Sequence, residues 1–146
     1  MNIEVKVDTS KFDKMMADFP TALARAQKRA LMDIGSEVAS QTDRAFKHPQ
    51  YRPSPWAPRK SGGTWPLLVK HPDGGLRATI KSKLVGDDTV VVGTDKKYAG
   101  YHQFGTKHMP ARPFMPLDRN GNLTPQMQQK INKIVEKDLA EELAML

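Results

Sequence analysis

Three prolines spaced three residues apart constrain this chain more than any other feature of its sequence. They are Pro110, Pro113 and Pro116. Proline fixes φ and has no backbone N–H, so a helix cannot run through this segment and a central strand would lose ladder hydrogen bonds. We therefore expect residues 110–116 to be extended and stiff, in part as an edge strand. Such a segment presents Arg112, Phe114 and Met115 in a fixed geometry suited to docking.

Length and composition indicate a single domain covering residues 1–146. Hydrophobic residues make up 38% of the chain and the mean hydropathy is −0.59, which favours a soluble protein with a thin core. No apolar run approaches the roughly eighteen residues of a membrane span, so no membrane contact is expected. The alternating, acidic N-terminus is not typical of a secretory signal. The absence of cysteine excludes disulfides and Cys-ligated zinc, and it fits synthesis in a reducing cytoplasm.

The net charge of +7 is concentrated in one block of the sequence. Residues 44–85 carry nine basic residues and one acidic residue. Residues 1–43 carry six basic and seven acidic residues, and residues 86–146 carry eight of each. Clustered cations create a local positive potential that attracts a phosphate-rich or acidic partner. A solvated loop whose charge maintains solubility is the alternative, and the sequence leaves both open.

Hydrophobic periodicity predicts an α+β fold, with a small antiparallel or mixed sheet packed against a long N-terminal helix and a C-terminal helix. Apolar residues recur at steps of three or four from Leu23 to Ala45, which predicts an amphipathic helix of about six turns. Small residues along it, such as Gly35, would let a sheet approach closely. Thr124 as a cap and Pro125 after it predict the start of the last helix.

The remaining predicted elements are short. Gly86-Asp87-Asp88 indicates the turn of a hairpin between two strands. Gly105 is expected to end a short helix in the αL conformation. The expected spans are a strand at 3–7, a helical turn at 10–19, strands at 76–84 and 89–94, and a short helix at 98–104.

A loop at residues 47–75 is expected to be mobile or to order on binding. Its first part, residues 47–66, contains five prolines, two glycines, two tryptophans and a tyrosine, which excludes regular structure. Trp56 and Trp65 either hold this loop on the core or anchor a partner, and at least one of them is expected to be exposed.

No group of residues in the sequence predicts catalysis, a cofactor or a metal site. His102 and His108 flank a short loop but lack an obvious third ligand, and His102 is expected to be packed and hydrogen-bonded. Asp87 and Asp88 are adjacent and point apart. The chain has no thiol nucleophile and no G-x-S-x-G elbow, and its Gly-Gly pairs lack the setting of a phosphate-binding loop. We therefore expect a protein that is not an enzyme.

Two motifs in the second half of the chain resemble a known family. The first runs from Tyr98 to Gly105 and contains His-Gln-Phe-Gly, and the second is Pro-Ala-Arg-Pro-Phe at residues 110–114. Both are similar to motifs of the tailed-bacteriophage virion morphogenesis family of tail-completion, neck and head–tail joining proteins. The stretch Gly75-Leu76-Arg77-Ala78-Thr79-Ile80 is also similar to that family, whereas residues 61–75 depart from its pattern.

This resemblance implies an assembly protein of the virion, made in the cytoplasm of a bacterial host. It implies an α+β subunit that forms a ring with copies of itself, by resemblance a hexamer, at the head–tail junction. Its partners would be adjacent neck, connector or tail-tube proteins, and DNA would pass through the channel. Tail completion, neck and head completion remain open as alternatives. The expected interface residues are Tyr101, His102, Phe104, Arg112, Phe114, Trp56 and Trp65.

The sequence leaves alternatives open for these residues and for the function. Phe104 and Phe114 would instead fill the subunit's own core, and Arg112 would instead bond a nearby carboxylate. A small basic nucleic-acid-binding module is the second functional hypothesis, with Tyr51 and the two tryptophans as stacking platforms. A third, an RNase-type toxin, lacks an identifiable acid and base. The expected contacts to DNA or an acidic partner are Arg52, Arg59, Lys60, Lys70 and Arg77.

Overall fold

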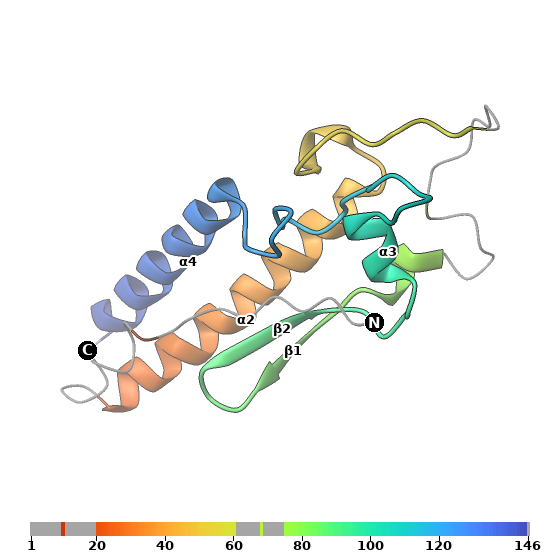
Figure 1. The fold of residues 1–146 in the computed structure, drawn as a ribbon. Helices are drawn as coiled ribbons and strands as arrows, with labels where there is room; N and C mark the ends of the chain where they lie inside the picture. The colour runs from red at the N-terminus through yellow and green to blue at the C-terminus, as the bar shows by residue number, and fades with distance from the viewer. Residues whose placement is uncertain (1–9, 11–19, 61–67, 69–74, 146) are drawn as a thin grey trace.

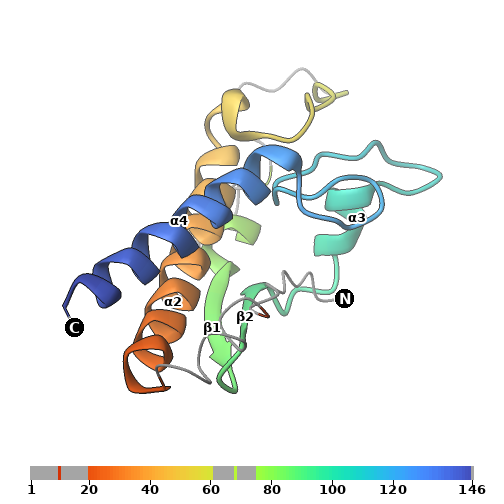
Figure 2. The ribbon, with the colours of Figure 1, turned by 90° about the vertical axis from the view of Figure 1, so that its left-hand side faces the viewer.

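The computed structural model describes residues 10, 20–60, 68 and 75–145. The predicted strand at 3–7 lies outside this part of the chain, as do residues 11–19 of the predicted helical turn at 10–19, Trp65 and Lys70. The described elements form the predicted α+β fold, in which the longest helix, α2, lies between the last helix and a two-stranded hairpin (Figures 1 and 2). The elements are α2 (Pro20–Ala45), η1 (Pro49–Tyr51), η2 (Gly75–Thr79), β1 (Lys81–Val85), β2 (Thr89–Gly93), α3 (Ala99–Phe104) and α4 (Pro125–Ala144).

Helix α2 is the predicted long helix, and it is slightly longer than expected at 26 residues, or about seven turns. Its apolar residues are buried on the side that meets the hairpin and α4. Gly35 has the predicted role of a close approach, because a Cβ there would lie 2.8 Å from Val90 Cγ2 and would clash with Ser82 Oγ. The buried positions of α2 include Leu23, Ala26, Ala30, Ile34, Val38 and Ala45.

The hairpin β1–β2 packs one face on α2 and turns the other outward. Its strands are antiparallel, and Lys83 pairs with Val91 across the ladder. Val90 and Val92 are buried in the core, whereas Lys81 and Lys83 are exposed, which is the period-two pattern of a half-buried hairpin. The chain reverses after Val85, at the predicted turn.

Residues 75–79 differ from the prediction, because they form the 3-10 helix η2 where a strand was expected. Gly75 adopts a φ of 62°, and the Thr79 hydroxyl donates to the Leu76 carbonyl at 2.7 Å, which closes a tight turn. Only Leu76 of this segment is buried. A similar short 3-10 turn, η1, lies in the proline-rich loop, where no regular structure was expected.

Helix α4 begins as predicted and runs antiparallel to α2 (Figure 2). The Thr124 hydroxyl accepts a hydrogen bond from Met127 N at 3.3 Å, and Pro125 occupies the first turn. Met127 and Ile131 are buried against α2, but the C-terminal half of α4 buries Asp138 and Glu142 instead. The contact between the two helices therefore changes from apolar to ionic along its length.

The ionic half of this contact is centred on two arginines of α2. Arg29 forms ion pairs with Glu141, with Asp138 at 3.6 Å and with Glu142 at 3.9 Å. Arg25 pairs with Glu142 at 3.3 Å. Burial of the Asp138 carboxyl raises its pKa from 3.8 to about 6, and a hydrogen bond and charge repulsion from the Asp33 carboxyl add to the rise against the attraction of Arg29.

The raised pKa of Asp138 predicts that part of the stability is lost as the pH rises. The folded state keeps a proton on this carboxyl between about pH 4 and 6 that the unfolded state has released, so the folded state is favoured below this range and less so above it. A shift of about two pKa units corresponds to at most about 3 kcal/mol. In Asp138→Asn this loss should disappear, as measured by urea unfolding at pH 4 and pH 7.

Asp87→Asn, in the exposed hairpin turn, is the matched control and should leave the pH dependence as in the wild type. A parallel pH dependence in Asp138→Asn and the wild type would contradict the assignment to this carboxyl.

Candidate assembly surface at helix α3 and the proline segment

Helix α3 presents one face to the core and another to the outside. Ala99, Gly100 and Gln103 are buried. The helix ends at Phe104, as predicted, and the Gly105 N–H donates to the Tyr101 carbonyl at 2.8 Å. Because α3 has only six residues, its position depends on the contacts of its buried face and on its C-terminal turn.

Gly105 does not adopt the αL conformation that the sequence suggested. Its φ of 76° and ψ of 174° lie in a region that is essentially restricted to glycine. The chain also passes very close to it, since a Cβ on Gly105 would lie 2.8 Å from Ala111 N. A tight turn closed by Thr106 N–H donating to the Met109 carbonyl at 2.9 Å brings the chain back. Gly105 is thus required both for its conformation and for the space beside it.

The buried amide of Gln103 holds the proline segment in place. Its Oε1 accepts hydrogen bonds from Phe114 N at 3.0 Å and from Met115 N at 2.9 Å, and its Nε2 donates to the Met115 carbonyl at 3.2 Å. Pro113 and Pro116 have no N–H, so these two donors are all that the backbone offers between them. One side chain therefore satisfies both buried N–H groups of a segment that forms neither a helix nor the edge strand expected in part.

Aromatic side chains join the proline segment to the end of α2 and to the loop that follows it. The Phe46 ring stacks on Phe114 at 5.2 Å and meets Trp56 edge-on at 6.2 Å. The Trp56 indole N–H donates to the Pro113 carbonyl at 2.6 Å. Phe114 is completely buried, which confirms the alternative that it fills the core. Trp56 is half-buried and holds its loop on the core.

The Arg112 side chain donates hydrogen bonds to backbone carbonyls of the proline-rich loop. Its Nε donates to the Ala57 carbonyl at 2.9 Å, and its Nη2 donates to the Pro58 carbonyl at 3.1 Å. Its backbone N–H donates to the His102 carbonyl at 2.7 Å. The alternative that Arg112 bonds a carboxylate is therefore wrong among the described residues, because its guanidinium donates to two loop carbonyls instead.

His102 is packed, but the expected hydrogen bond is missing at one nitrogen. The ring lies edge-on to Tyr98 at 5.8 Å, and its buried Nδ1 has no partner among the described residues. Burial lowers the pKa of His102, and the nearby positive charge of Arg112 lowers it further. The ring is therefore neutral at pH 7.

Three aromatic side chains lie exposed around α3. Tyr98 is 41% exposed, Tyr101 50% and Phe104 43%. They are three residues apart, so they share one face of the helix. The alternative that Phe104 fills the core is wrong, because its side chain is exposed, whereas Ala99, Gly100 and Gln103 are the buried residues of α3.

An open groove of about 760 Å³ lies beside this aromatic face. Phe104, Pro53, Pro55 and Pro113 form part of its wall, and Asp118 and Arg119 supply charged groups. The aromatic face is thus continuous with a groove between the proline-rich loop and the proline segment.

The basic residues expected to contact DNA differ in whether they form contacts within the subunit. The Arg52 guanidinium lies over the Trp56 ring at 3.6 Å and donates to the Ala45 carbonyl at 2.6 Å, so it serves the fold. Arg77 donates twice to Asp43, at 2.6 and 2.9 Å, and this bonding lowers the pKa of Asp43. Arg59 is half-buried and Lys60 is exposed. Lys70 lies outside the described residues.

Within the described ranges, no three His, Asp or Glu side chains are placed to hold a metal ion. No helix in that same part of the chain has the length and apolar character needed to cross a membrane. The described residues form an exposed aromatic face at α3, and the hydrogen bonds of Gln103 hold the proline segment beneath it.

Two residues of this surface were missed by the sequence reasoning. Gln103 was noticed only as part of a motif, yet its amide is the main polar contact of the proline segment. A signal was present, because Phe114 and Met115 stand between two prolines and their N–H groups need an acceptor. Tyr98 was read as the start of a helix, and its spacing of three from Tyr101 was the available signal for a shared face.

Comparisons with known proteins agree with the resemblance seen in the motifs. Residues 7–140 match the phage virion morphogenesis family. The protein "Mu-like prophage FluMu G protein 1" of Haemophilus influenzae is 29% identical over 157 aligned residues, which cover 97% of this chain and 97% of that protein. No solved structure matches the chain.

The Gln103 contacts predict a large loss of stability in Gln103→Ala. Two buried N–H groups would lose their acceptor, and each unsatisfied group costs about 1–3 kcal/mol, so the free energy of unfolding should fall by about 2–6 kcal/mol. Urea unfolding measures this change. Gln129→Ala, on the exposed side of α4, is the control and should change it by less than about 0.5 kcal/mol. Equal effects of the two substitutions would contradict the role of Gln103.

The conformation of Gly105 predicts that Gly105→Ala is worse than the same change at Gly121. Both glycines have positive φ, 76° and 80°, but only Gly105 has backbone atoms within 4 Å of the added Cβ. Gly121→Ala should cost about 1–2 kcal/mol through its backbone alone. Gly105→Ala should cost clearly more, as measured by thermal unfolding of the two variants. Similar melting temperatures would contradict the close approach at Ala111.

Proposed function

Because this chain belongs to the phage virion morphogenesis family, we propose that its role in building the virion is performed at the head–tail junction. Copies of the chain form a ring there that completes the tail or joins it to the head. The family is one of structural and assembly proteins, and the relative in Haemophilus influenzae is named as a Mu-like prophage protein. The proposed contacts are with further copies of the chain and with neighbouring neck, connector or tail-tube proteins.

The observation that carries this proposal is the exposed aromatic face formed by Tyr98, Tyr101 and Phe104. Large aromatic side chains contribute most to protein–protein contacts, because they bury much area with few rotatable bonds. Each of these three is between 41% and 50% exposed in the single subunit. We propose that this face meets a second copy of the chain in the ring, a hexamer by family resemblance.

The base beneath this face favours docking without rearrangement. Gln103 fixes the proline segment, and Gly105 allows that segment to lie directly against the end of α3. Arg112 and Trp56 then hold the adjoining loop through bonds to backbone carbonyls. A surface that is already ordered loses little conformational entropy on association, so more of the contact energy appears as affinity.

The four expected interface residues that are buried or half-buried support this surface from below. Phe114 and Trp56 pack with Phe46, and His102 lies under Tyr98. Arg112 bonds the loop carbonyls. In the proposed ring these residues position the contact, and Tyr101 and Phe104 make it.

The triple variant Tyr98→Ala, Tyr101→Ala, Phe104→Ala tests the contact. Since the three side chains are exposed, the variant should fold with nearly unchanged stability. It should remain a monomer at protein concentrations where the wild type forms rings, as measured by light scattering after size exclusion and by negative-stain microscopy. In a phage that carries the variant gene, free heads and free tails should accumulate.

The matched control replaces three other exposed hydrophobic residues with alanine. Met32 is 54% exposed, Val85 45% and Met145 67%, and none of them lies on α3. This control should form rings and give joined particles. Normal rings and infectious particles from the aromatic variant would remove the α3 face from the proposal. Joined, infectious particles after deletion of the whole gene would overturn the role at the junction.

A further inference from the structure

Several of the basic residues in the block at 44–85 are used within the subunit. Arg52 lies on Trp56 and bonds the end of α2, and Arg77 is paired with Asp43. Lys81 and Lys83 differ from both, because they are exposed on β1 and have no carboxylate within ion-pair distance among the described residues. The positive charge that stays available to a partner therefore includes these two lysines of the hairpin.

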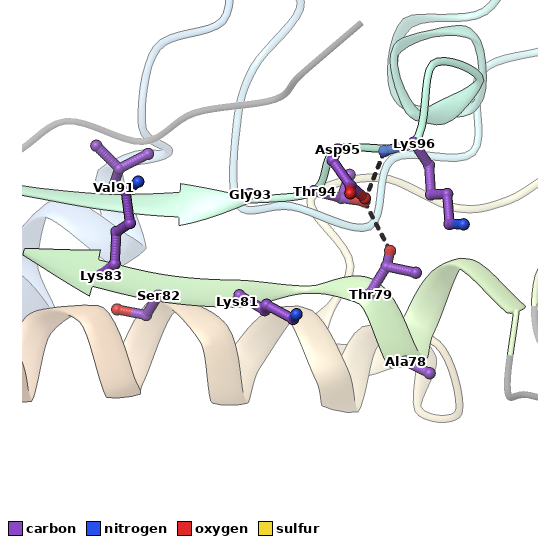
Figure 3. Close-up of a pocket in the computed structure, with 10 residues that line it drawn as sticks. All are labelled: Ala78, Thr79, Lys81, Ser82, Lys83, Val91, Gly93, Thr94, Asp95 and Lys96. Atoms are coloured by element: carbon purple, nitrogen blue, oxygen red, sulfur yellow. Dashed lines mark hydrogen bonds between the residues drawn. The ribbon is translucent and has the colours of Figure 1, made fainter.

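The lysines line a hollow at the hairpin (Figure 3). Its volume is about 550 Å³. Lys81 and Lys83 belong to β1, and Lys96 reaches the same hollow from the turn after β2. Ser82, between the two strand lysines, also lines the hollow, and its Oγ lies beside Gly35 of α2. The alternation of β1 thus places both lysines on one side.

Most of the charge that lines the hollow is positive. Three ammonium groups face it, and Asp95 is the only carboxylate among the described residues that line it. The hydroxyls of Thr79 and Thr94 bond each other at 2.6 Å, and Thr94 also accepts from Lys96 N at 3.1 Å. These bonds hold Thr79 and Thr94 of the lining in place, and within the described part of the chain the three lysine side chains have no carboxylate partner.

We propose that this hollow binds the sugar-phosphate backbone of duplex DNA without regard to sequence. Lys81 and Lys83 are two residues apart on one strand, so their Cα atoms are about 7 Å apart, which suits contacts to successive phosphates of one nucleic-acid strand. Lysine ammonium groups and threonine hydroxyls are common partners of such phosphates. The site takes the phosphate backbone as its ligand.

The lining of the hollow also argues against two related ligands. None of the described residues that line it is aromatic, so they offer no platform on which the bases of a single strand would stack. These described lining residues also include no arginine, asparagine or glutamine, the side chains that commonly read base edges in a groove. The nucleic-acid hypothesis drawn from the sequence used the whole basic block at 44–85, with Tyr51 and the two tryptophans as stacking platforms. The present site shares only Lys81 and Lys83 with that block and uses none of the expected contacts Arg52, Arg59, Lys60, Lys70 and Arg77.

The test measures binding of the full chain to a random duplex of about 30 base pairs by fluorescence anisotropy between about 50 and 200 mM salt. In the variant Lys81→Ala, Lys83→Ala, Lys96→Ala the affinity at the lowest salt should fall about tenfold or more. The slope of log affinity against log salt should become shallower by about two to three, because each phosphate contact contributes about 0.9. The variant with arginine at the three positions should bind like the wild type.

The control variant removes the same number of charges elsewhere, through Lys28→Ala, Lys107→Ala and Lys133→Ala. These lysines are exposed and lie away from the hollow, so their loss should leave the slope within about one of the wild type. Equal losses in both triple variants would overturn the proposal, because net charge alone would explain them. It would also be overturned if the hairpin variant bound DNA normally but failed to form rings, since the lysines would then serve a protein contact.

The result is independent of the proposed ring contact. The aromatic variant of α3 should bind the duplex with unchanged affinity as a monomer, because its three residues do not line the hollow. Loss of ring formation there and loss of DNA binding in the hairpin variant are therefore separable outcomes.

Discussion

The hydrogen bonds of the Gln103 side chain are the interaction on which this end of the structure depends. The flanking prolines leave Phe114 N and Met115 N as the donors of a segment that is fully buried. In most proteins a neighbouring strand would accept these bonds, but here a single amide oxygen does so. Without it, the cost of burying two unsatisfied donors would oppose the packing of Phe114 on Phe46. The aromatic core and the polar clamp therefore form together.

In the proline-rich loop, too, side chains form the hydrogen bonds to the backbone that a neighbouring strand would otherwise form. Trp56 donates to the Pro113 carbonyl, and Arg112 donates to the carbonyls of Ala57 and Pro58. Each of two segments, more than fifty residues apart in the chain, thus uses a side chain to satisfy the backbone of the other. Two irregular segments can in this way be held against the core although neither joins a sheet. Arg52 extends the arrangement to the Ala45 carbonyl at the end of α2 and to the Phe46 carbonyl just after it.

The sequence predicted the parts of this fold that local patterns control. The apolar spacing of α2, the turn between β1 and β2, and the capping of α4 by Thr124 depend on residues near one another in the chain. The roles of Gln103 and Arg112 depend on partners that the fold brings in from a distance, and no local pattern identifies these. Residues 75–79 alternate like a strand, but Gly75 and the Thr79 hydroxyl favour a tight turn instead. The exposure of Phe104 goes with the burial of Gln103, because adjacent residues of a helix point in different directions.

The turn between β2 and α3 determines how the two proposed surfaces lie relative to each other. Thr94 accepts from Lys96 N, and the Lys96 carbonyl accepts from Ala99 N at 3.2 Å, so the turn is bonded to both elements. Lys96 faces the hollow, and Tyr98, two residues later, belongs to the aromatic face. A change in the position of α3 would therefore move Lys96 as well. In a ring built through the α3 face, every copy would hold its lysine hollow at the same fixed orientation to the contact, and a repeating row of positive sites would follow from the symmetry alone.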